Sequence, residues 1–509
     1  MGSKYFDLKL PTDYSDSDIR RELKKALGTS DFDYQLEKQS LDARSKNIHW
    51  QVRVVATSDS IKTNFEETPP FQLPKYIKDS GKVAVVGSGP AGFYCAYLLQ
   101  LSGFDVTLFE RGPEVFERIK KVKEFEKGGP LDERANYAYG EGGAGTFSDG
   151  KLTSRTKSIV KERKWIFEQY IEAGAPPEIR YLSKPHIGSN LLVKTAKNLR
   201  KKFLSLGGRI HFDTDVVGLN FLNGTIQSIE TEKGQFEADH FIFATGHSSY
   251  PVYRMLIEAG AKFTNKPFAI GARIEHRQEL INMAKWRKAE LPGVKAADYA
   301  LTHPDSPAPV YSFCMCPGGM VVPAPTNRQS NIVNGMSNYK RNYPFANSAI
   351  VAGIYLPQLL DKELSPMESL DWLTSLEKKF YDYADGYSAP AVKASDLLNG
   401  NSTSTFPDSS YPFNRVTADF TELFPKIVVE SMKIALQYFE KKISGFGDGI
   451  LMGLESRTSS PIQAMRGQGG LLDGFTNLYM AGEGSGYSGG IVSSAADGLL
   501  TAVHIAESR

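Results

Sequence analysis

The chain has 509 residues, 41% of them hydrophobic and 23% charged, which is the composition of a globular protein with more than one core. Its 60 lysines and arginines are offset by 58 acidic residues, so a net charge of +2 supports neither nucleic acid nor an anionic membrane as a partner. The N-terminus lacks the apolar core of a signal peptide, and no run approaches the ~20 apolar residues that span a bilayer. Three cysteines are too few for a disulfide framework. We therefore expect a cytoplasmic protein.

Residues 1–75 are expected to form a separate unit, because they end in a proline-bearing stretch, ETPPFQLPK, that is typical of a linker. Residues 5–10 alternate as a strand does. Residues 19–27 have helical spacing after a Ser-Asp-Ser start signal, and strand-like runs cover 32–38 and 47–56. The segment therefore predicts a small βαββ domain.

The most informative stretch is KVAVVGSGPAG at 82–92, which predicts a buried strand, a glycine turn and a helix. In a dinucleotide site Gly87 makes the tight turn, Gly89 lets the backbone approach a pyrophosphate, and Gly92 allows close packing of helix on strand. Glu110 ends the next apolar strand, where a carboxylate accepts hydrogen bonds from an adenosine ribose. This order of features predicts a dinucleotide site.

Glycine loops then alternate with regular elements. The loop YGEGGAGTFSDGK at 139–151 is too rich in glycine to be a packed element, and such loops let the backbone approach a ligand. A helix is predicted over 190–206. It is followed by a β-meander that contains a tight Asn223-Gly224 hairpin, with strands at 209–212, 216–222, 225–230 and 241–244.

The character of the chain changes between 262 and 445, where prolines recur and helices are predicted at 366–384 and 426–442. We interpret this part as an inserted substrate domain. The last part, 446–509, contains a short strand, LYMAG, then Glu483, a glycine loop and a helix that begins near Gly490. We therefore expect 80–261 and 446–509 to form a single nucleotide-binding domain.

Several stretches together resemble flavoproteins of the glutathione-reductase structural group, in particular a largely uncharacterised branch of FAD-dependent dehydrogenases. The resemblance covers almost the whole chain and is carried by GEGGAGTFSDGKL at 140–152, KPFAIGARIEH at 266–276, SFCMCPGG at 312–319, NGMSNYKR at 334–341, and ESRTSSP and AGEGSGYSGGIVSSAADG near the C-terminus. It implies an α/β architecture: a Rossmann-like FAD-binding domain with an inserted α+β substrate domain and the small N-terminal βαββ domain. It also implies a bound FAD in extended form.

The resemblance assigns roles at the adenosine end of FAD. The pyrophosphate would be held by Gly87, Gly89, Ala91 and Gly92. Glu110 would bind the ribose and Arg111 would lie near the adenine. The backbone of Val217 would contact the adenine edge, and Gly246 would border the adenosine half.

At the flavin end, the resemblance implies that the flavin or pyrophosphate is lined by Gly145, Ser148 and Lys151. Gly482 and Glu483 would approach the ribityl chain and pyrophosphate. A helix N-terminus would stabilise negative charge at the isoalloxazine C2 carbonyl, formed by Gly490, Ile491 and Val492.

Cys314 and Cys316, in the sequence CMCPGG, are the one conspicuous reactive-looking pair. They fit a thiol pair that relays electrons to or from the flavin, or a thiolate poised near the ring. The alternative is a tight turn at 317–319 that carries buried thiols beside the flavin.

The segment around 273–276 is predicted to be a strand, and its three polar side chains would alternate between its faces. Arg273 and Glu275 would share one face as a structural salt bridge, and His276 would lie on the other. With an ordinary pKa of ~6.5, His276 is a candidate proton donor to a substrate, although a lone histidine is more often packed or solvated.

The sequence thus predicts an FAD-dependent oxidoreductase, a dehydrogenase or a reductase of carbon–carbon double bonds, that acts on a small molecule by flavin hydride transfer. No second unit of strand, GxGxxG and helix occurs between 262 and 445, so NAD(P)H would bind transiently at the flavin face or electrons would come from elsewhere. An FAD monooxygenase remains an alternative. So does a non-catalytic, flavin-binding redox sensor whose N-terminal domain docks a partner.

Overall fold

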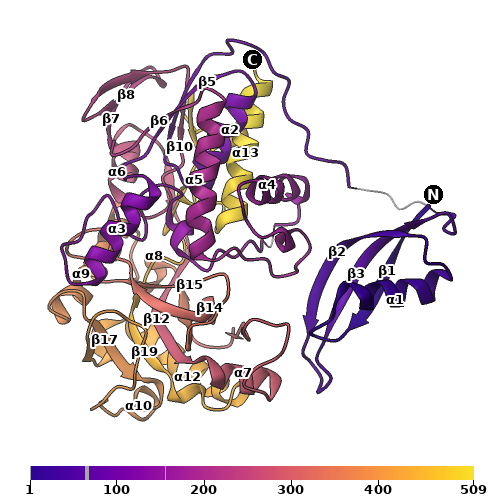
Figure 1. Cartoon of the computed structure of the whole chain (residues 1–509). Helices are drawn as coiled ribbons and strands as arrows, with labels where there is room; N and C mark the ends of the chain where they lie inside the picture. The colour runs from indigo at the N-terminus through magenta and orange to yellow at the C-terminus, as the bar shows by residue number, and fades with distance from the viewer. Residues whose placement is uncertain (1, 64–67, 155) are drawn as a thin grey trace.

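The computed structural model describes residues 2–63, 68–154 and 156–509 (Figure 1). Their strands form a three-stranded N-terminal sheet, a five-stranded parallel sheet, an eight-stranded sheet and two smaller sheets. Within these ranges, none of the helices combines the length and the apolar character that crossing a bilayer requires.

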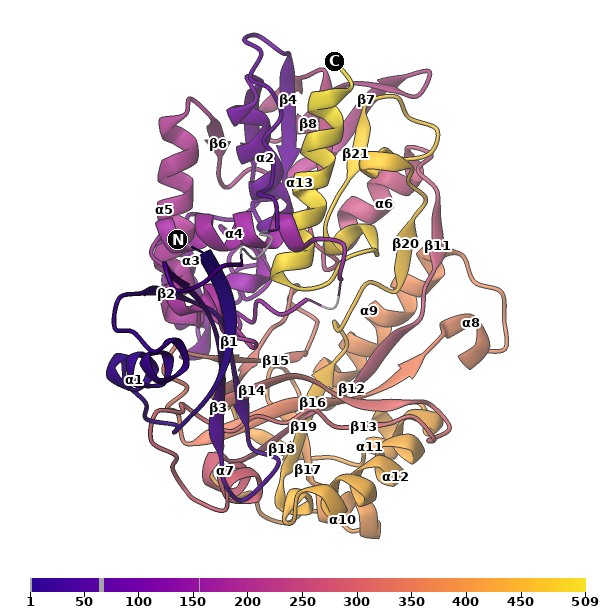
Figure 2. The same cartoon turned by 90° about the vertical axis from the view of Figure 1, so that its right-hand side faces the viewer.

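The N-terminal unit has the predicted βαββ order (Figures 1 and 2). Its elements are β1 (Gly2–Leu10), α1 (Asp16–Leu27), β2 (Asp33–Asp42) and β3 (His49–Ser58). The sheet order is β1-β3-β2, and α1 buries Ile19 and Leu23 in a small core. The edge strand β2 contacts the rest of the chain, because Gln39 N donates to Tyr181 O at 2.8 Å and Ser183 N donates to Gln39 O at 2.9 Å.

The five-stranded sheet is parallel and brings the two ends of the nucleotide-binding part together. Its order is β21-β10-β4-β5-β6, with bounds Leu478–Met480, His240–Phe243, Lys82–Val86, Asp105–Phe109 and Arg209–His211. Helix α13 (Ile491–Glu507) lies beside α2 (Pro90–Leu101) in both views (Figures 1 and 2). Gly498 permits this approach, because a Cβ there would overlap the carbonyl of Ala91. The Rossmann-like class is confirmed.

The predicted four-strand β-meander is wrong. Strands β6 and β10 belong to the parallel sheet, whereas β7 (Val216–Leu222) and β8 (Thr225–Thr231) form a separate antiparallel sheet with β9 (Gly234–Glu237). The Asn223-Gly224 hairpin is confirmed, with positive φ at both residues. The alternation of apolar and polar residues indicates that a segment is a strand, but it does not indicate which strand it pairs with.

The eight-stranded sheet dominates the other half of the molecule. Its order is β13-β14-β16-β12-β19-β17-β18, with β15 paired to β14. The bounds in chain order from β12 to β19 are Phe268–Arg277, Thr302–His303, Val310–Pro323, Val333–Ser337, Phe345–Ile354, Ala389–Lys393, Arg415–Thr417 and Ile450–Glu455. Strand β19 (Ile450–Glu455) lies in this sheet, although the sequence predicts that residues 446–509 belong to the FAD-binding domain. The division of the chain into domains stays a prediction.

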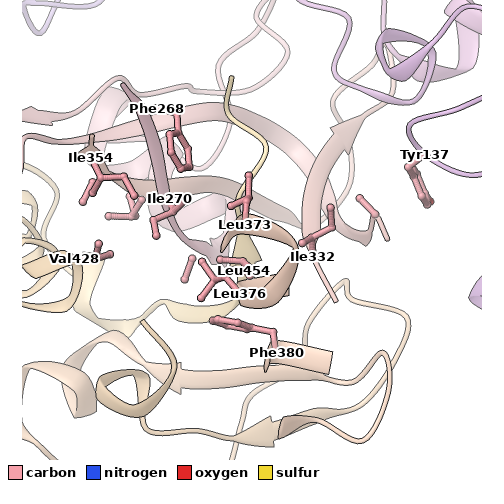
Figure 3. Close-up of a cluster of buried hydrophobic side chains, with 14 of the residues drawn as sticks. Tyr137, Phe268, Ile270, Ile332, Ile354, Leu373, Leu376, Phe380, Val428 and Leu454 are labelled. Atoms are coloured by element: carbon pink, nitrogen blue, oxygen red, sulfur yellow. The ribbon is translucent and has the colours of Figure 1, made fainter. Parts of the chain in front are cut away.

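Helices pack on this sheet and close its core. Figure 3 shows Phe268 and Ile270 of β12 facing Leu373, Leu376 and Phe380 of α9 (Pro366–Tyr383). Two of the predicted helices are observed here, α9 and α12 (Lys426–Lys442). The remaining helices of this half are α7 (Gln278–Trp286), α8 (Leu356–Leu359), α10 (Ala394–Asn399) and α11 (Phe420–Leu423).

The helices around the parallel sheet complete the fold. They are α3 (Val115–Glu126), α4 (Val160–Glu172), α5 (Ser189–Ser205) and α6 (Tyr250–Glu258), of which α5 matches the helix predicted over 190–206. The two-stranded sheet pairs β11 (Phe263–Asn265) with β20 (Ile462–Ala464). Both strands lie in the connections between the parallel and the eight-stranded sheet.

Candidate functional site

Three glycines from separate segments leave space open at the carboxyl edge of the parallel sheet. Gly89 precedes α2, Gly246 follows β10, and Gly490 precedes α13. A Cβ at Gly246 or Gly490 would meet no heavy atom within 4 Å, and one at Gly89 would meet only Gly143 Cα at 3.8 Å. We call these three residues the glycine cradle. Two helix N-termini with unpaired N–H groups border it, a setting that favours an anion.

Other predicted glycines serve the packing that surrounds this cradle. Gly87 has φ +103°, and a Cβ there would lie 2.5 Å from Ala244 O. A Cβ on Gly92 would overlap the carbonyl of Gly87, and one on Gly482 would lie 2.6 Å from Ala91 Cβ. These contacts agree with the tight turn and close helix packing that the fingerprint predicts.

Glu110 is 5% exposed and its carboxylate is already fully hydrogen-bonded by the protein. Oε2 accepts from Ser88 N at 3.0 Å and Ser88 Oγ at 2.6 Å. Oε1 accepts from Gly112 N at 3.0 Å and Gly140 N at 3.2 Å. The ribose contact stays a prediction. In the structure, the Glu110 carboxylate connects the glycine turn, through Ser88, to the loops that contain Gly112 and Gly140.

The residues expected near the adenine lie beyond Glu110. Arg111 Nε lies 3.2 Å from Asp215 Oδ1, and its guanidinium lies over the ring of Tyr139 at 4.4 Å from the ring centre. Val217, on β7, is 60% exposed, and its contact with the adenine stays a prediction.

A fully buried arginine that sequence reasoning missed, Arg118 of α3, shapes the loop at 139–151. Its Nε and Nη1 donate to the carbonyls of Asn136, Gly140, Glu141 and Gly143 at 2.9–3.1 Å. Burial lowers the pKa of this guanidinium to about 9. Nothing in the sequence marks this role, since the acceptors are backbone carbonyls.

The same loop connects the glycine cradle to the eight-stranded sheet. A Cβ on Gly143 would lie 3.0 Å from Gly89 Cα, and one on Gly145 would lie 3.0 Å from Ile491 Cγ1. Ser148 Oγ donates to Gly145 O at 2.7 Å. At the far end, the Lys151 ammonium donates to the carbonyl of Met315 on β14.

A buried ion pair holds this end of the loop. Asp149 is 1% exposed and accepts from Arg341 Nη2 at 2.5 Å and Nε at 3.1 Å. The hydroxyl of Ser337 on β15 donates to the same carboxylate. The loop is therefore fastened to the sheet that carries the cysteine pair.

Cys314 and Cys316 lie beside Lys151 in an irregular part of β14. Cys314 has φ +45° and is partly exposed, whereas Cys316 is buried and its Sγ lies 3.3 Å from Cys314 O. A hydrogen bond from Cys316, together with the positive charges of Lys151 and Arg273, lowers the pKa of the Cys314 thiol. The same coupling raises the pKa of Cys316. Of the two thiols, Cys314 is therefore the one whose surroundings favour the thiolate form.

The predicted salt bridge between Arg273 and Glu275 is wrong. Arg273 Nε donates to Glu455 Oε2 of the neighbouring strand β19 at 3.0 Å, and its Nη1 donates to Asn347 Oδ1 at 2.5 Å. Glu275 instead accepts from Ser410 N at 3.1 Å. Side chains on adjacent strands lie closer together than residues i and i+2 of one strand, so the cross-strand partner prevails.

His276 does not join the cysteine pair. It lies three residues along β12 from Arg273, on the opposite face, where its Nε2 is 2.8 Å from Phe446 O. Burial lowers its pKa to about 4, so the ring is neutral at pH 7. The hydrogen-bond partner of the His276 ring is a backbone carbonyl and not a reacting group, and a catalytic role for His276 stays a prediction.

Glu483 follows β21 and borders the cradle with His247, whose Nδ1 lies 3.5 Å from Glu483 Oε1. His247 Nε2 lies 3.0 Å from the carbonyl of Arg457. Arg457 itself is paired with Glu377 of α9, at 3.0 and 2.8 Å from the two carboxylate oxygens. This buried pair connects α9 to the cradle region, and it leaves Arg457 no free charge for a substrate.

The donor set suits a dinucleotide and not a metal ion. Backbone N–H groups, small residues and two helix N-termini surround the cradle. Across the ranges that the structure describes, no three or more His, Cys, Asp or Glu side chains are gathered as a metal would require.

Comparison with known proteins gives matches in both halves of the chain. Residues 267–458 match a family described as FAD-dependent protein, C-terminal domain-like, and residues 85–143 match the NAD(P)-binding Rossmann-like domain. A protein of Clostridium beijerinckii, described as an uncharacterized protein, is 36% identical over 491 residues, which cover 92% of this chain and 91% of that protein.

Other likenesses are local or distant. The NADPH-Fe(3+) oxidoreductase subunit beta of Geobacter sulfurreducens is 41% identical over 75 residues, which cover 14% of this chain and 11% of that subunit. Among solved structures, CtdE in complex with FAD is 12% identical with a TM-score of 0.36, and the alignment covers 84% of this chain and 88% of CtdE.

Proposed function

The chain belongs to the family of FAD-dependent oxidoreductases, with FAD as its cofactor, and on that premise we propose that it is a dehydrogenase or a reductase of carbon–carbon double bonds. Its substrate would be a small molecule held between the parallel sheet and the eight-stranded sheet. The motifs further support a place in the glutathione-reductase structural group.

The glycine cradle is the observation that carries this proposal. The space at Gly89, Gly246 and Gly490 is open, and a larger side chain at any of these positions would extend into it. The N-terminus of α2 would bind the pyrophosphate and that of α13 the flavin. Bound FAD supplies the hydride or electron transfer, so the protein need only bind, orient and adjust charge.

The chain's own contribution beside the cradle is the loop at 139–151. It packs against α13 through Gly145 and reaches β14 through Lys151. There the coupling to Cys316 and the positive charges of Lys151 and Arg273 lower the pKa of the Cys314 thiol. We propose Cys314 and Cys316 as the catalytic candidates of the site, in preference to His276.

The test is to load the full chain with FAD and reduce it under anaerobic conditions with NADH and with NADPH. We expect the apoprotein to take up FAD, and the local match to an NADPH-dependent subunit favours NADPH as a transient donor. Compounds that restore the oxidised flavin spectrum would then identify the substrate class. Protein that neither carries FAD when purified nor takes it up on reconstitution would refute the proposal.

A further inference from the structure

The cysteine pair lies in a bulge of β14. This strand pairs with β16 at Phe313–Ala349 and at Cys316–Asn347, so three steps along β14 match two along β16. Cys314 occupies this bulge with φ +45°, a conformation that residues other than glycine rarely adopt. Such backbone outliers cluster at functional sites, where the surrounding structure maintains them.

The two thiols differ in exposure and in charge. Cys314 is partly exposed and its pKa is lowered, first by the hydrogen bond from Cys316 and then by Lys151 and Arg273. Cys316 is fully buried, and the coupling to Cys314 raises its pKa. A partly exposed thiol of lowered pKa beside a second thiol is an arrangement that favours thiol–disulfide exchange.

The pair is also connected to the cradle by a short path through one loop. Lys151 donates to the carbonyl of Met315, the residue between the two cysteines. Six residues earlier, Gly145 packs against Ile491 in the first turn of α13. The segment that would line the flavin therefore touches the backbone of the cysteine pair.

We propose that Cys314 and Cys316 form a redox centre that cycles between dithiol and disulfide and exchanges two electrons with FAD. This inference rests on the proposed function only in taking FAD as the electron partner. In the oxidising direction a bond forms between the two Sγ atoms and the S–H bond of Cys316 breaks. Its proton and the electron pair pass to FAD, which becomes the reduced anion FADH⁻. One negative charge, on the Cys314 thiolate before and on the flavin after, is conserved.

The test is an anaerobic dithionite titration of the oxidised, FAD-loaded full chain. Because a disulfide is a two-electron couple, wild-type protein should accept four electrons per FAD, and Cys316→Ser should accept two. The matched control is Cys95→Ala, since Cys95 is buried in α2, remote from β14 in sequence, and should leave the uptake at four. Alkylation in denaturant gives an independent readout: three free thiols in the reduced wild type and one in the oxidised form.

The electron count and the thiol count distinguish a failure of the redox centre from a failure of the proposed function. Wild-type protein that binds FAD, accepts two electrons and keeps three alkylatable thiols would overturn the redox centre while leaving the proposed function intact. Protein that binds no FAD refutes the proposed function, and the thiol count across a glutathione redox series still decides whether the pair cycles. If Cys316→Ser does not fold, the electron and thiol counts of the wild type are sufficient.

Discussion

Replacing Gly89 with alanine separates what the fold requires from what the cofactor requires. Gly89 has φ −66° and ψ 178°, a backbone conformation that any residue adopts. The new Cβ would have Gly143 Cα as its nearest heavy atom, at 3.8 Å, which is ordinary van der Waals contact. Glycine to alanine at a compatible position stabilises a protein by about 0.4–1 kcal/mol, because the unfolded chain loses freedom. Gly89 is also the N-cap of α2, where glycine is preferred to alanine, so the two effects offset and the apoprotein of Gly89→Ala should stay within about 1 kcal/mol of wild-type stability.

FAD binding, in contrast, should weaken. The added methyl group would occupy the space through which the pyrophosphate approaches the N-terminus of α2. Loss of one hydrogen bond to a charged group costs about 1.5–3 kcal/mol. The Kd for FAD should therefore rise by about tenfold to a hundredfold.

Both quantities are measurable on the same preparation, by titrating the apoprotein with FAD and by unfolding it in urea. Gly447→Ala is the matched control, because its Cβ would lie 3.4 Å from Glu440 Oε2 in the other half of the chain and should leave the Kd unchanged. A Gly89→Ala protein that binds FAD like wild type would show that no pyrophosphate approaches this turn. A clear loss of apoprotein stability would refute the argument from backbone geometry.

Glu110→Gln should lower the free energy of unfolding of the apoprotein by about 1–3 kcal/mol in a urea titration, because the amide nitrogen would face donors that now bind a carboxylate; an unchanged midpoint would contradict this. Arg273→Met should cost about 3–5 kcal/mol by thermal unfolding, since Glu455 would be left buried and unpaired, and adding Glu455→Gln should restore part of that loss. Iodoacetamide should label Cys314 of the folded protein at pH ~7, where an ordinary thiol of pKa ~8.5 is mostly protonated, and Lys151→Met should slow the labelling measured by mass spectrometry. A labelling rate that rises with pH as it does for an ordinary thiol would show that the sulfur is not held as a thiolate.

Local patterns predicted the elements of the parallel sheet well. The strand, turn and helix at β4 and α2 follow from glycine spacing within a few residues, and α13 follows from the glycine loop before it. The pairing of strands was harder to predict. β6 and β10 looked like members of a meander because their partners, β5, β4 and β21, lie elsewhere in the sequence.

In the candidate site, too, residues with local requirements were predicted and contacts between distant parts of the chain were not. The glycines of the cradle were predicted because their backbone requirements are local. Arg118 was missed because its partners are backbone carbonyls, and the pairing of Arg273 was wrong because Glu455 lies 182 residues further along the chain. Residue spacing carries no signal for such a contact.

The sequence by itself determined a dinucleotide fingerprint, a helix N-terminus near Gly490 and a cysteine pair, since each depends on neighbours within a few residues. Only the tertiary structure decided that one loop contacts both Ile491 and Met315, and that Cys316, Lys151 and Arg273 lie where they lower the pKa of the Cys314 thiol. Periodicity assigns a side chain to a face, whereas charge stabilisation acts over a few ångströms between side chains that only the folded chain brings together.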